Sequence, residues 1–304
     1  MVLSAACWGL GTVATKAALN GLPPLTLLVV QMSVSVLFLW IIFFATKQTL
    51  TLGKDMVRLG LAGLLNPGMA YAFALIGLSM TTASMSSLLW AAEPALILGL
   101  AWFVLKERPA STTIIFSIVA ITGAILVVTG STGLESGGLI VGNLIIVVAV
   151  FCCAIYTVLT RQTVERVKPI PLIAVQLTVS LVLALLIWPI EFSESPWVIL
   201  SNLQPSTWFW AATSGIIYYA LAFMFYILGL RKMAASEAGL YLNLIPIFGI
   251  VGAYFFLGDR LNPVQWIGVF IILFAVLAIS VLQKQGIVLR ARFKQKRRAV
   301  ELNT

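Results

Sequence analysis

Long stretches of this sequence contain no charged residue at all. Residues 17–46 and 109–134 lack Asp, Glu, Lys and Arg, and only 10% of the 304 residues are charged, against about 25% in a soluble domain. A helix of about 20 apolar residues spans the hydrocarbon core of a bilayer. Inside that core the backbone N–H and C=O groups must be bonded within the protein, which a helix achieves in one segment. The sequence therefore predicts an all-α integral membrane protein.

Short polar connections divide the apolar stretches into ten predicted transmembrane helices. Turn-forming segments such as "NGLPP" (20–24) and "GDRLNP" (258–263) mark the borders. The predicted helices cover residues 2–20, 25–45, 56–79, 82–105, 112–130, 138–161, 170–190, 207–230, 235–257 and 263–283. The first is interpreted as a span and not as a cleavable signal peptide, because no basic segment precedes it; its early start also fits a truncated N-terminus.

The basic residues predict how these helices are oriented. If the basic tail (284–304) is cytoplasmic, 17 of the 19 Lys and Arg residues fall on the cytoplasmic side, and only Lys16 and Arg260 lie towards the other. Such an excess is typical of cytoplasmic loops. We therefore expect a multi-pass protein of the plasma (inner) membrane with both termini in the cytoplasm. The net charge of +9 is concentrated beside the spans, where it suits anionic lipid and not nucleic acid.

Two five-helix units, 1–130 and 138–283, are related to each other. "ASMSSLLWAAEPALILGLAWFVLKER" (83–108) aligns without gaps with "ASEAGLYLNLIPIFGIVGAYFFLGDR" (235–260), so that Pro94 meets Pro246. Gln31 aligns with Gln176 in a second pair of segments. Because five is odd, the second unit is predicted to cross the membrane in the opposite direction. Inverted repeats are typical of secondary transporters; a duplication without functional meaning is the alternative.

These motifs resemble the EamA-like branch of the drug/metabolite transporter superfamily. The resemblance rests on "CWGLGTVATKAAL" (7–19) and on a proline followed at a fixed spacing by Lys-Glu-Arg in one unit and Gly-Asp-Arg in the other. It covers essentially the whole chain. It implies a ten-helix carrier of small metabolites, and many such carriers export amino acids. The family often has arginines where this chain has Gln31 and Gln176, so an arginine clasp for phosphate or carboxylate is not implied.

Glu93 and Pro94 stand together within the predicted helix 82–105. Glu93 lies about eleven residues into this helix, or about 16 Å deep, and a charge at that depth usually marks a solute or ion pathway. We predict that Glu93 binds substrate, or carries a proton if protons are the coupling ion; a structural ion pair is the alternative. Lys16 is its predicted partner, unless it extends to the lipid headgroups. Pro94 and Pro246 are predicted to shape gates, with simple packing kinks as the alternative.

Further polar and aromatic side chains lie at a similar depth. Aromatic rings with a polar tip suit the wall of a small-molecule pocket, and a buried amide must find a hydrogen bond. The predicted substrate-binding set, besides Glu93 and Lys16, is Trp8, Asn66, Tyr71, Trp90, Tyr156, Tyr218, Tyr241 and Asn243. Each of these can instead serve packing. Gln31 and Gln176 are predicted to join helices across an interface.

The predicted function is secondary transport of a small metabolite by alternating access. The solute is expected to be amino acid-like or otherwise small and polar or amphipathic, and export is a candidate direction. A passive channel or facilitator and a lipid-type carrier are the alternatives. No phosphate-binding G-x-x-x-x-G-K-[ST] motif, no histidine and no nucleophile beside a base is present, so we expect neither ATP hydrolysis nor an enzyme, and no cofactor or metal. Both a monomer and a homodimer remain open.

Overall fold

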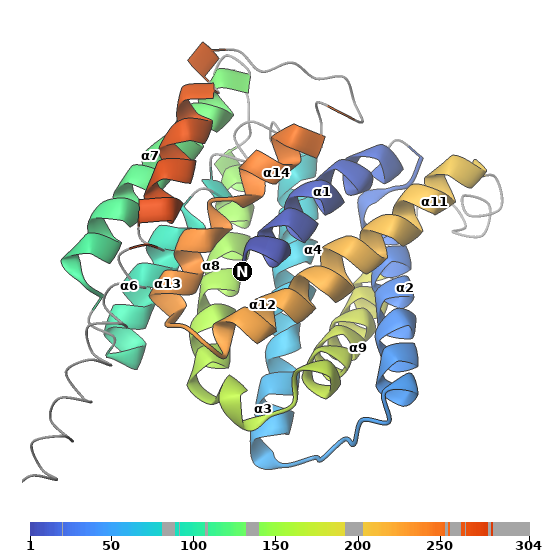
Figure 1. Ribbon diagram of the computed structural model, residues 1–304. Coiled ribbons are helices and arrows are strands. Elements are labelled where there is room, and N and C mark those ends of the chain that lie inside the picture. Colours follow the sequence, from blue (N-terminus) through green and yellow to red (C-terminus); the bar gives the residue numbers. More distant parts are fainter. Residues whose placement is uncertain are drawn as a thin grey trace, which may run out of the picture.

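The computed structural model describes residues 1–19, 21–80, 89–90, 92–106, 109–131, 140–191, 203–252, 255, 263–264, 266–278 and 281. Every regular element within these ranges is a helix (Figure 1). The first half of the chain comprises α1 (Val2–Leu19), α2 (Pro24–Ala45), α3 (Lys54–Leu61), η1 (Ala62–Leu64), η2 (Leu65–Met69), α4 (Ala70–Ser79), α6 (Glu93–Leu105) and α7 (Ser111–Ser131).

The described residues of the second half of the chain are also helical. It comprises α8 (Ile140–Thr163), η3 (Val164–Arg166), α9 (Pro169–Ile187), η4 (Trp188–Glu191), α11 (Pro205–Ser214), η5 (Gly215–Leu221), α12 (Ala222–Leu230), α13 (Ala235–Leu242) and α14 (Ile245–Gly252). Residues Trp266–Ala278 form a further apolar helix.

Within the described residues, six helical stretches are long and apolar enough to cross a membrane. They are Val2–Leu19, Pro24–Ala45, Lys54–Gly77, Ile140–Arg166, Pro169–Glu191 and Pro205–Leu230. Glu93–Leu105, Ser111–Gly123 and Trp266–Ala278 are shorter apolar helices. Apolar side chains also cover the outside of the bundle: on α2, Leu37, Ile41 and Phe44 are 63%, 57% and 69% exposed at helical spacing. A surface of this kind suits contact with lipid and not with water.

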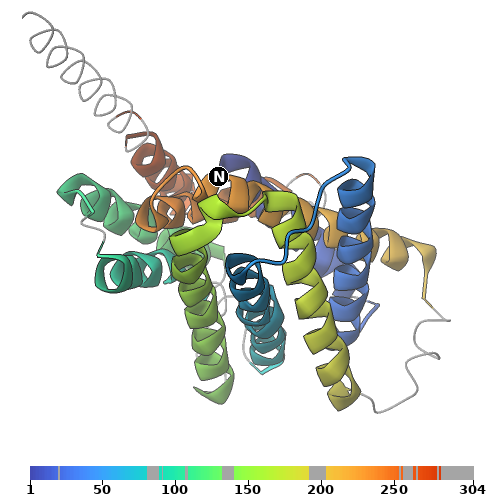
Figure 2. The ribbon, with the colours of Figure 1, turned by 90° about the horizontal axis from the view of Figure 1, so that it is seen from below.

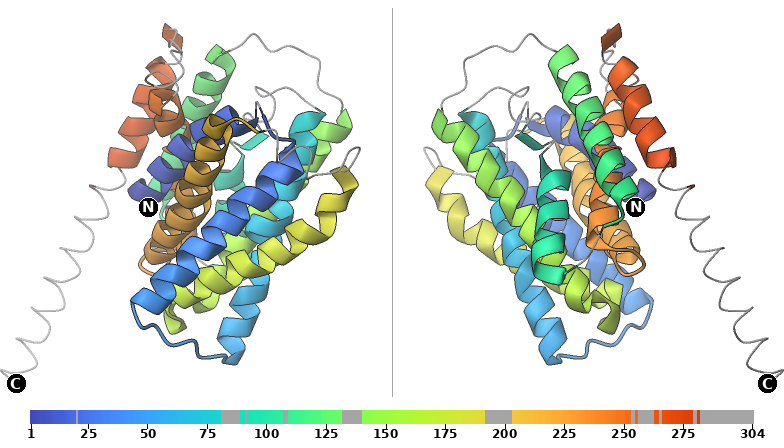
Figure 3. Two further views of the ribbon diagram at one scale, coloured as in Figure 1. Left: turned by 90° about the vertical axis from the view of Figure 1, so that its right-hand side faces the viewer. Right: turned by 90° about the vertical axis from the view of Figure 1, so that its left-hand side faces the viewer.

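The helices pack in pairs that join distant parts of the chain. α2 packs against α9, α4 against α8, and α1 against α14. Seen from below, α3 lies between α8 and α9 (Figure 2). α7 and helix 266–278 lie side by side at the edge of the bundle (Figure 3), where the rings of Phe116 and Phe274 are 6.1 Å apart.

Four of the predicted helices are interrupted. The predicted helix 56–79 breaks at Asn66, whose backbone is extended (φ −148°, ψ 121°), and the predicted helix 207–230 contains the wide π-type turn η5. The predicted helix 235–257 is divided into α13 and α14. In the predicted helix 82–105, Ala92 lies in a turn and α6 begins directly after it. Proline explains three of these breaks, because it lacks an N–H and fits best at the start of a helix.

Two glycines allow closely similar helix contacts in the two halves. A Cβ atom on Gly63 would collide with the backbone of Gln176, and one on Gly215 would collide with the backbone of Gln31. The glycines lie in η1 and η5, and the glutamines lie in α9 and α2. The same close approach of two backbones therefore occurs twice.

Candidate functional site

Glu93 is the first residue of α6, with Pro94 directly behind it. Its predicted position in the middle of a continuous helix is thus corrected. Proline is favoured in the first turn of a helix because the N–H it lacks has no partner there, and an acid in that turn interacts favourably with the helix dipole. α14 begins in the same way with Ile245 and Pro246. The carboxylate and the proline stand side by side because together they start a helix.

The Glu93 carboxylate has no bonded partner in the described part of the chain. Its side chain is surrounded by protein yet keeps some accessible surface. It lies within electrostatic range of Cys153, Tyr218 and Tyr226, but no hydrogen bond or ion pair joins it to a described residue. The predicted partner, Lys16, belongs to α1, and its side chain lies outside the described part.

An aromatic cluster lies next to this carboxylate. We define the cluster as Trp8, Tyr71, Tyr156, Tyr218, Tyr219, Phe223 and Tyr226, which come from α1, α4, α8, η5 and α12. Its rings meet mostly edge to face. The ring centre of Tyr71 is 5.4 Å from that of Tyr218 and 5.2 Å from that of Tyr219. Trp8 lies 5.3 Å from both Phe223 and Tyr226.

Four tyrosine hydroxyl groups of the aromatic cluster have partners, either at its rim or within it. Tyr156 donates to Oε1 of Gln176 at 3.1 Å, and Tyr226 shares a hydrogen bond of 2.5 Å with Thr157. The hydroxyl groups of Tyr71 and Tyr218 interact with each other. These bonds fix the rings, so their faces and edges are presented in a defined arrangement.

The structure brings together some of the predicted site residues. Trp8, Tyr71, Tyr156 and Tyr218 belong to the aromatic cluster, and Trp90 packs beside Tyr71 against Ala70, Cys152 and Cys153. Asn66 is buried at the break in the third span. Its Oδ1 atom has no hydrogen-bond partner among the described residues, contrary to the expectation that a buried amide finds one.

Two predicted residues lie elsewhere. Tyr241 packs with Phe116 and Val119 against a separate apolar cluster that includes Ala120 and Ile272. Asn243 donates from Nδ2 to the carbonyl of Leu240 at 3.0 Å. This bond is local to the turn between α13 and α14, so it explains the asparagine without a solute.

Three residues of the aromatic cluster were not in the predicted set. Tyr219, Phe223 and Tyr226 lie four and three residues apart, which places them on one face of a helix. This spacing is the signal in the sequence that identifies them. All three are almost fully buried.

The two glutamines join helices as predicted. Gln31 donates from Nε2 to Oγ1 of Thr15 at 3.0 Å and to Oγ of Ser214 at 2.7 Å. Gln176 donates from Nε2 to the carbonyl of Leu59 at 2.8 Å. Each amide therefore stabilises contacts between spans that are distant in sequence.

An all-helical bundle with several candidate membrane spans is typical of a multi-pass integral membrane protein. The model of the EamA-like transporter family matches the chain twice, over residues 1–129 and 140–281. The chain belongs to this family and is a transporter, not an enzyme.

Relatives of similar length support this assignment. The "Uncharacterized transporter YvbV" of Bacillus subtilis is 25% identical over 281 residues, which cover 91% of this chain and 89% of that protein. The "Uncharacterized transporter YyaM" of the same organism is 24% identical, covering 82% of this chain and 81% of that one. A solved crystal structure has the same fold, with a TM-score of 0.77 at 17% identity over 93% of this chain and 96% of that chain.

Proposed function

We propose that this protein is a secondary transporter that moves a small polar or amphipathic solute, amino acid-like in size, by alternating access. The observation that carries the proposal is the Glu93 carboxylate, which stands at the start of a helix beside the aromatic cluster without a bonded partner in the described residues. Export is the direction that we propose.

Energetics favour a cationic group as the partner of Glu93. A carboxylate deep in a membrane protein costs from about 2.5 kcal/mol upwards when nothing compensates it. An ammonium group on the solute would supply the opposite charge, and the faces of nearby Tyr71 and Tyr218 rings would attract it further. A proton on Glu93 would neutralise the same charge, so we propose protons as the coupling ion.

Alternating access requires two halves that can exchange conformations, and we propose ten helices in two inverted five-helix repeats, 1–130 and 138–283. Three observations support this: the double family match, the helix starts at Glu93-Pro94 and Ile245-Pro246, and the two glycine–glutamine contacts. In this scheme Pro94 and Pro246 lie at matching hinges, where a helix can tilt without losing a backbone hydrogen bond.

The proposed orientation places both termini in the cytoplasm of a cell bounded by the plasma (inner) membrane. It is tested with single cysteines in a background from which Cys7, Cys152 and Cys153 have been removed. Cysteines at Glu135 and Ser195 should react with an impermeant thiol reagent added outside intact cells, whereas cysteines at Arg166 and Lys232 should react only after permeabilisation. The reverse pattern would exclude both the orientation and the inverted repeat.

The proposed site is tested with Glu93→Gln, which removes the charge and nearly keeps the shape. Purified protein is screened by thermal shift against matched solutes with and without an ammonium group. We expect ammonium solutes to stabilise the wild type and to bind Glu93→Gln roughly 10–100-fold more weakly, because a hydrogen bond to a charged group contributes about 1.5–3 kcal/mol. The control is Glu165→Gln, which changes an exposed carboxylate outside the aromatic cluster.

Transport itself is measured by counterflow in proteoliposomes with the tightest-binding amine. A carrier is stimulated by solute on the opposite side, and a passive channel is not. We expect stimulation that is lost in Glu93→Gln and kept in Glu165→Gln. Wild-type affinity and rates in Glu93→Gln would leave this carboxylate a structural group and the site wrongly assigned.

A further inference from the structure

Trp8 carries a hydrogen-bond donor for which the described residues offer no acceptor. Its indole Nε1 is buried, and no acceptor for it exists among the described residues. Two other tryptophans show that the fold provides such acceptors: Trp40 donates to Oγ1 of Thr178 and Trp188 donates to Oγ1 of Thr26, both at 3.0 Å. Trp8 is only 7% exposed, so water does not easily replace the missing acceptor.

The Trp8 indole N–H and the Glu93 carboxylate lie in the same region of the bundle, on either side of the neighbourhood of Tyr226. The Trp8 ring meets Tyr226 at 5.3 Å with an angle of 61° between the ring planes. Tyr226 also lies within electrostatic range of Glu93. The hydroxyl group of Tyr226 is hydrogen-bonded to Thr157, so it is not the acceptor of the Trp8 indole N–H. A polar donor and a carboxylate in this region therefore both lack a partner among the described residues.

We propose that Trp8 is a specificity-determining residue whose indole N–H donates to an oxygen acceptor on the same solute whose ammonium group Glu93 binds. This inference rests on the proposed function, because it assumes that the solute enters the aromatic cluster. A site that holds a buried donor in place rejects an analogue without the acceptor, since the donor then stays unpaired. Trp8 thus selects solutes with an oxygen acceptor, and Glu93 selects solutes with an ammonium group.

The competing explanation is a bond from the indole N–H to the face of a neighbouring ring. Phe223 lies 5.3 Å from Trp8 at 83° and is the obvious candidate. Such N–H···π contacts are weaker than ordinary hydrogen bonds. In that case Trp8 would be satisfied internally and would not distinguish between solutes.

The test compares two amines that share an isobutyl side chain and an ammonium group. L-leucinamide carries a carboxamide with a carbonyl acceptor, and isoamylamine lacks it. Their affinities for the full-length protein are measured by thermal shift and by competition in proteoliposomes. We expect the wild type to bind L-leucinamide at least about tenfold more tightly, which corresponds to one neutral hydrogen bond.

The variants separate the two roles. Trp8→Phe keeps an aromatic ring without the N–H, and we expect it to bring the affinity ratio of the two amines close to 1. Glu93→Gln should weaken both amines by a similar factor and keep their ratio. Phe223→Leu, which removes the candidate ring acceptor, should leave the ratio above 1.

A direct readout is the indole resonance of Trp8 in protein labelled with 15N-tryptophan, identified by its loss in Trp8→Phe. It should move downfield with L-leucinamide and not with isoamylamine. An unmoved resonance, a wild-type ratio near 1, or a ratio retained in Trp8→Phe would each overturn the role of Trp8 while leaving Glu93 as the charge site. If neither amine binds the wild type, both this inference and the ammonium site fail. The wild-type ratio requires no variant, so a folding defect in Trp8→Phe does not protect the proposal.

Discussion

The two ends of the α2–α9 helix pair are held by different kinds of contact. α2 begins with Pro24, directly after Pro23, and α9 begins with Pro169. Neither start has a cap from its own flanking residue, although the first N–H groups of a helix need acceptors. We call the end that contains the start of α2 the Glu191 end, and the end that contains the start of α9 the Lys168 end.

At the Glu191 end, the missing cap comes from the other half of the chain. The carboxylate of Glu191 accepts from the backbone N–H of Leu25 at 2.9 Å and of Thr26 at 2.7 Å. It also accepts from Oγ1 of Thr26 at 2.9 Å, and Trp188 donates to the same hydroxyl. Because the prolines have no N–H, one carboxylate satisfies the first two donors of α2.

At the Lys168 end, the polar contacts are more exposed. Lys168 donates from Nζ to Oγ1 of Thr49 at 3.0 Å, and Arg166 lies 3.6 Å from Asp55 with side chains that are 69% and 36% exposed. A cavity of about 540 Å³ opens here. Its lining residues are Thr49, Thr51, Gly53, Lys54, Asp55, Met56, Arg166, Val167 and Lys168.

Among the described residues, the Glu191 end is therefore held by more deeply buried hydrogen bonds than the Lys168 end. Hydrogen bonds between a carboxylate and buried groups are costly to break, whereas exposed ion pairs contribute little. If the proposed alternating access holds, this conformation is closed at the Glu191 end and can open at the Lys168 end. With the proposed orientation, the Lys168 end is the cytoplasmic end.

The largest expected effect comes from removing the carboxylate at the Glu191 end. Glu191→Ala leaves two backbone donors and the buried Thr26 hydroxyl with fewer partners, so we expect a loss of about 2–4 kcal/mol in unfolding free energy. Chemical denaturation in detergent measures this change. Hydrogen exchange at Leu25 and Thr26 should also become faster, because the start of α2 is no longer fastened.

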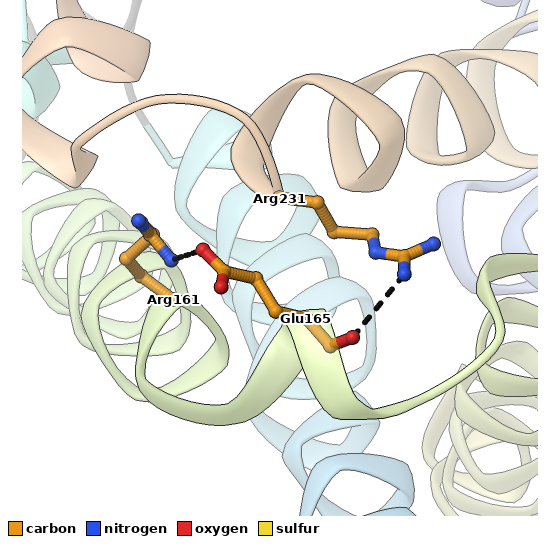
Figure 4. A network of polar contacts seen from close by, with 3 residues as sticks. All are labelled: Arg161, Glu165 and Arg231. Carbon is orange, nitrogen blue, oxygen red and sulfur yellow. Dashed lines mark hydrogen bonds and ion pairs between the residues drawn. The ribbon is translucent and has the colours of Figure 1, made fainter.

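The matched control lies at the other end of the molecule. Glu165 pairs with Arg161 at 2.7 Å, and its carbonyl accepts from Nη2 of Arg231 at 3.2 Å (Figure 4). The Arg231 bond uses the backbone and survives substitution of the side chain. Glu165→Ala should therefore cost at most about 0.5 kcal/mol. Equal losses in Glu165→Ala and Glu191→Ala would contradict the comparison.

A smaller effect is expected from the hydroxyl that links Trp188 to Glu191. Thr26→Val keeps the shape and leaves the two backbone bonds to Glu191 in place, so we expect a loss of about 1 kcal/mol. The double variant with Trp188→Phe should cost little more than Thr26→Val alone, because both changes remove the same bond. Additive losses in the unfolding measurements would show that the two side chains act independently.

The sequence predicted the borders of α2 and α9 but not the hydrogen bonds that Glu191 makes to the start of α2. Apolar length and proline borders place α2 at 25–45 and α9 from residue 170, close to the observed Pro24–Ala45 and Pro169–Ile187. Glu191 fell in a connecting segment, and its bonding partners lie 165 and 166 positions away in the sequence. Local patterns carry no information about such a contact.

The candidate site, too, could be predicted only in part from the sequence. A carboxylate in an apolar run identifies Glu93, and helical spacing can identify Tyr219, Phe223 and Tyr226. Whether Pro94 kinks a helix or starts one depends on the packing of its neighbours, so the break before Glu93 was not predictable. Depth along a helix likewise grouped Tyr241 with the site, although the direction of its side chain places it in another cluster.

The smallest expected effect concerns the ion pair at the Lys168 end. Arg166→Gln removes the charge that faces Asp55 at 3.6 Å, and the unfolding free energy should change by less than about 0.5 kcal/mol because water and salt screen this exposed pair. Any difference between Arg166→Gln and the wild type should vanish when the salt concentration is raised from about 0.05 M to 1 M, where the screening length falls to about 3 Å. Glu191→Ala should show no such salt dependence, because its lost bonds go to buried N–H and hydroxyl groups and not to an exposed charge. A large, salt-independent loss in Arg166→Gln would mean that the Lys168 end is fastened as firmly as the Glu191 end, and the described conformation could then not be assigned to one side of the transport cycle.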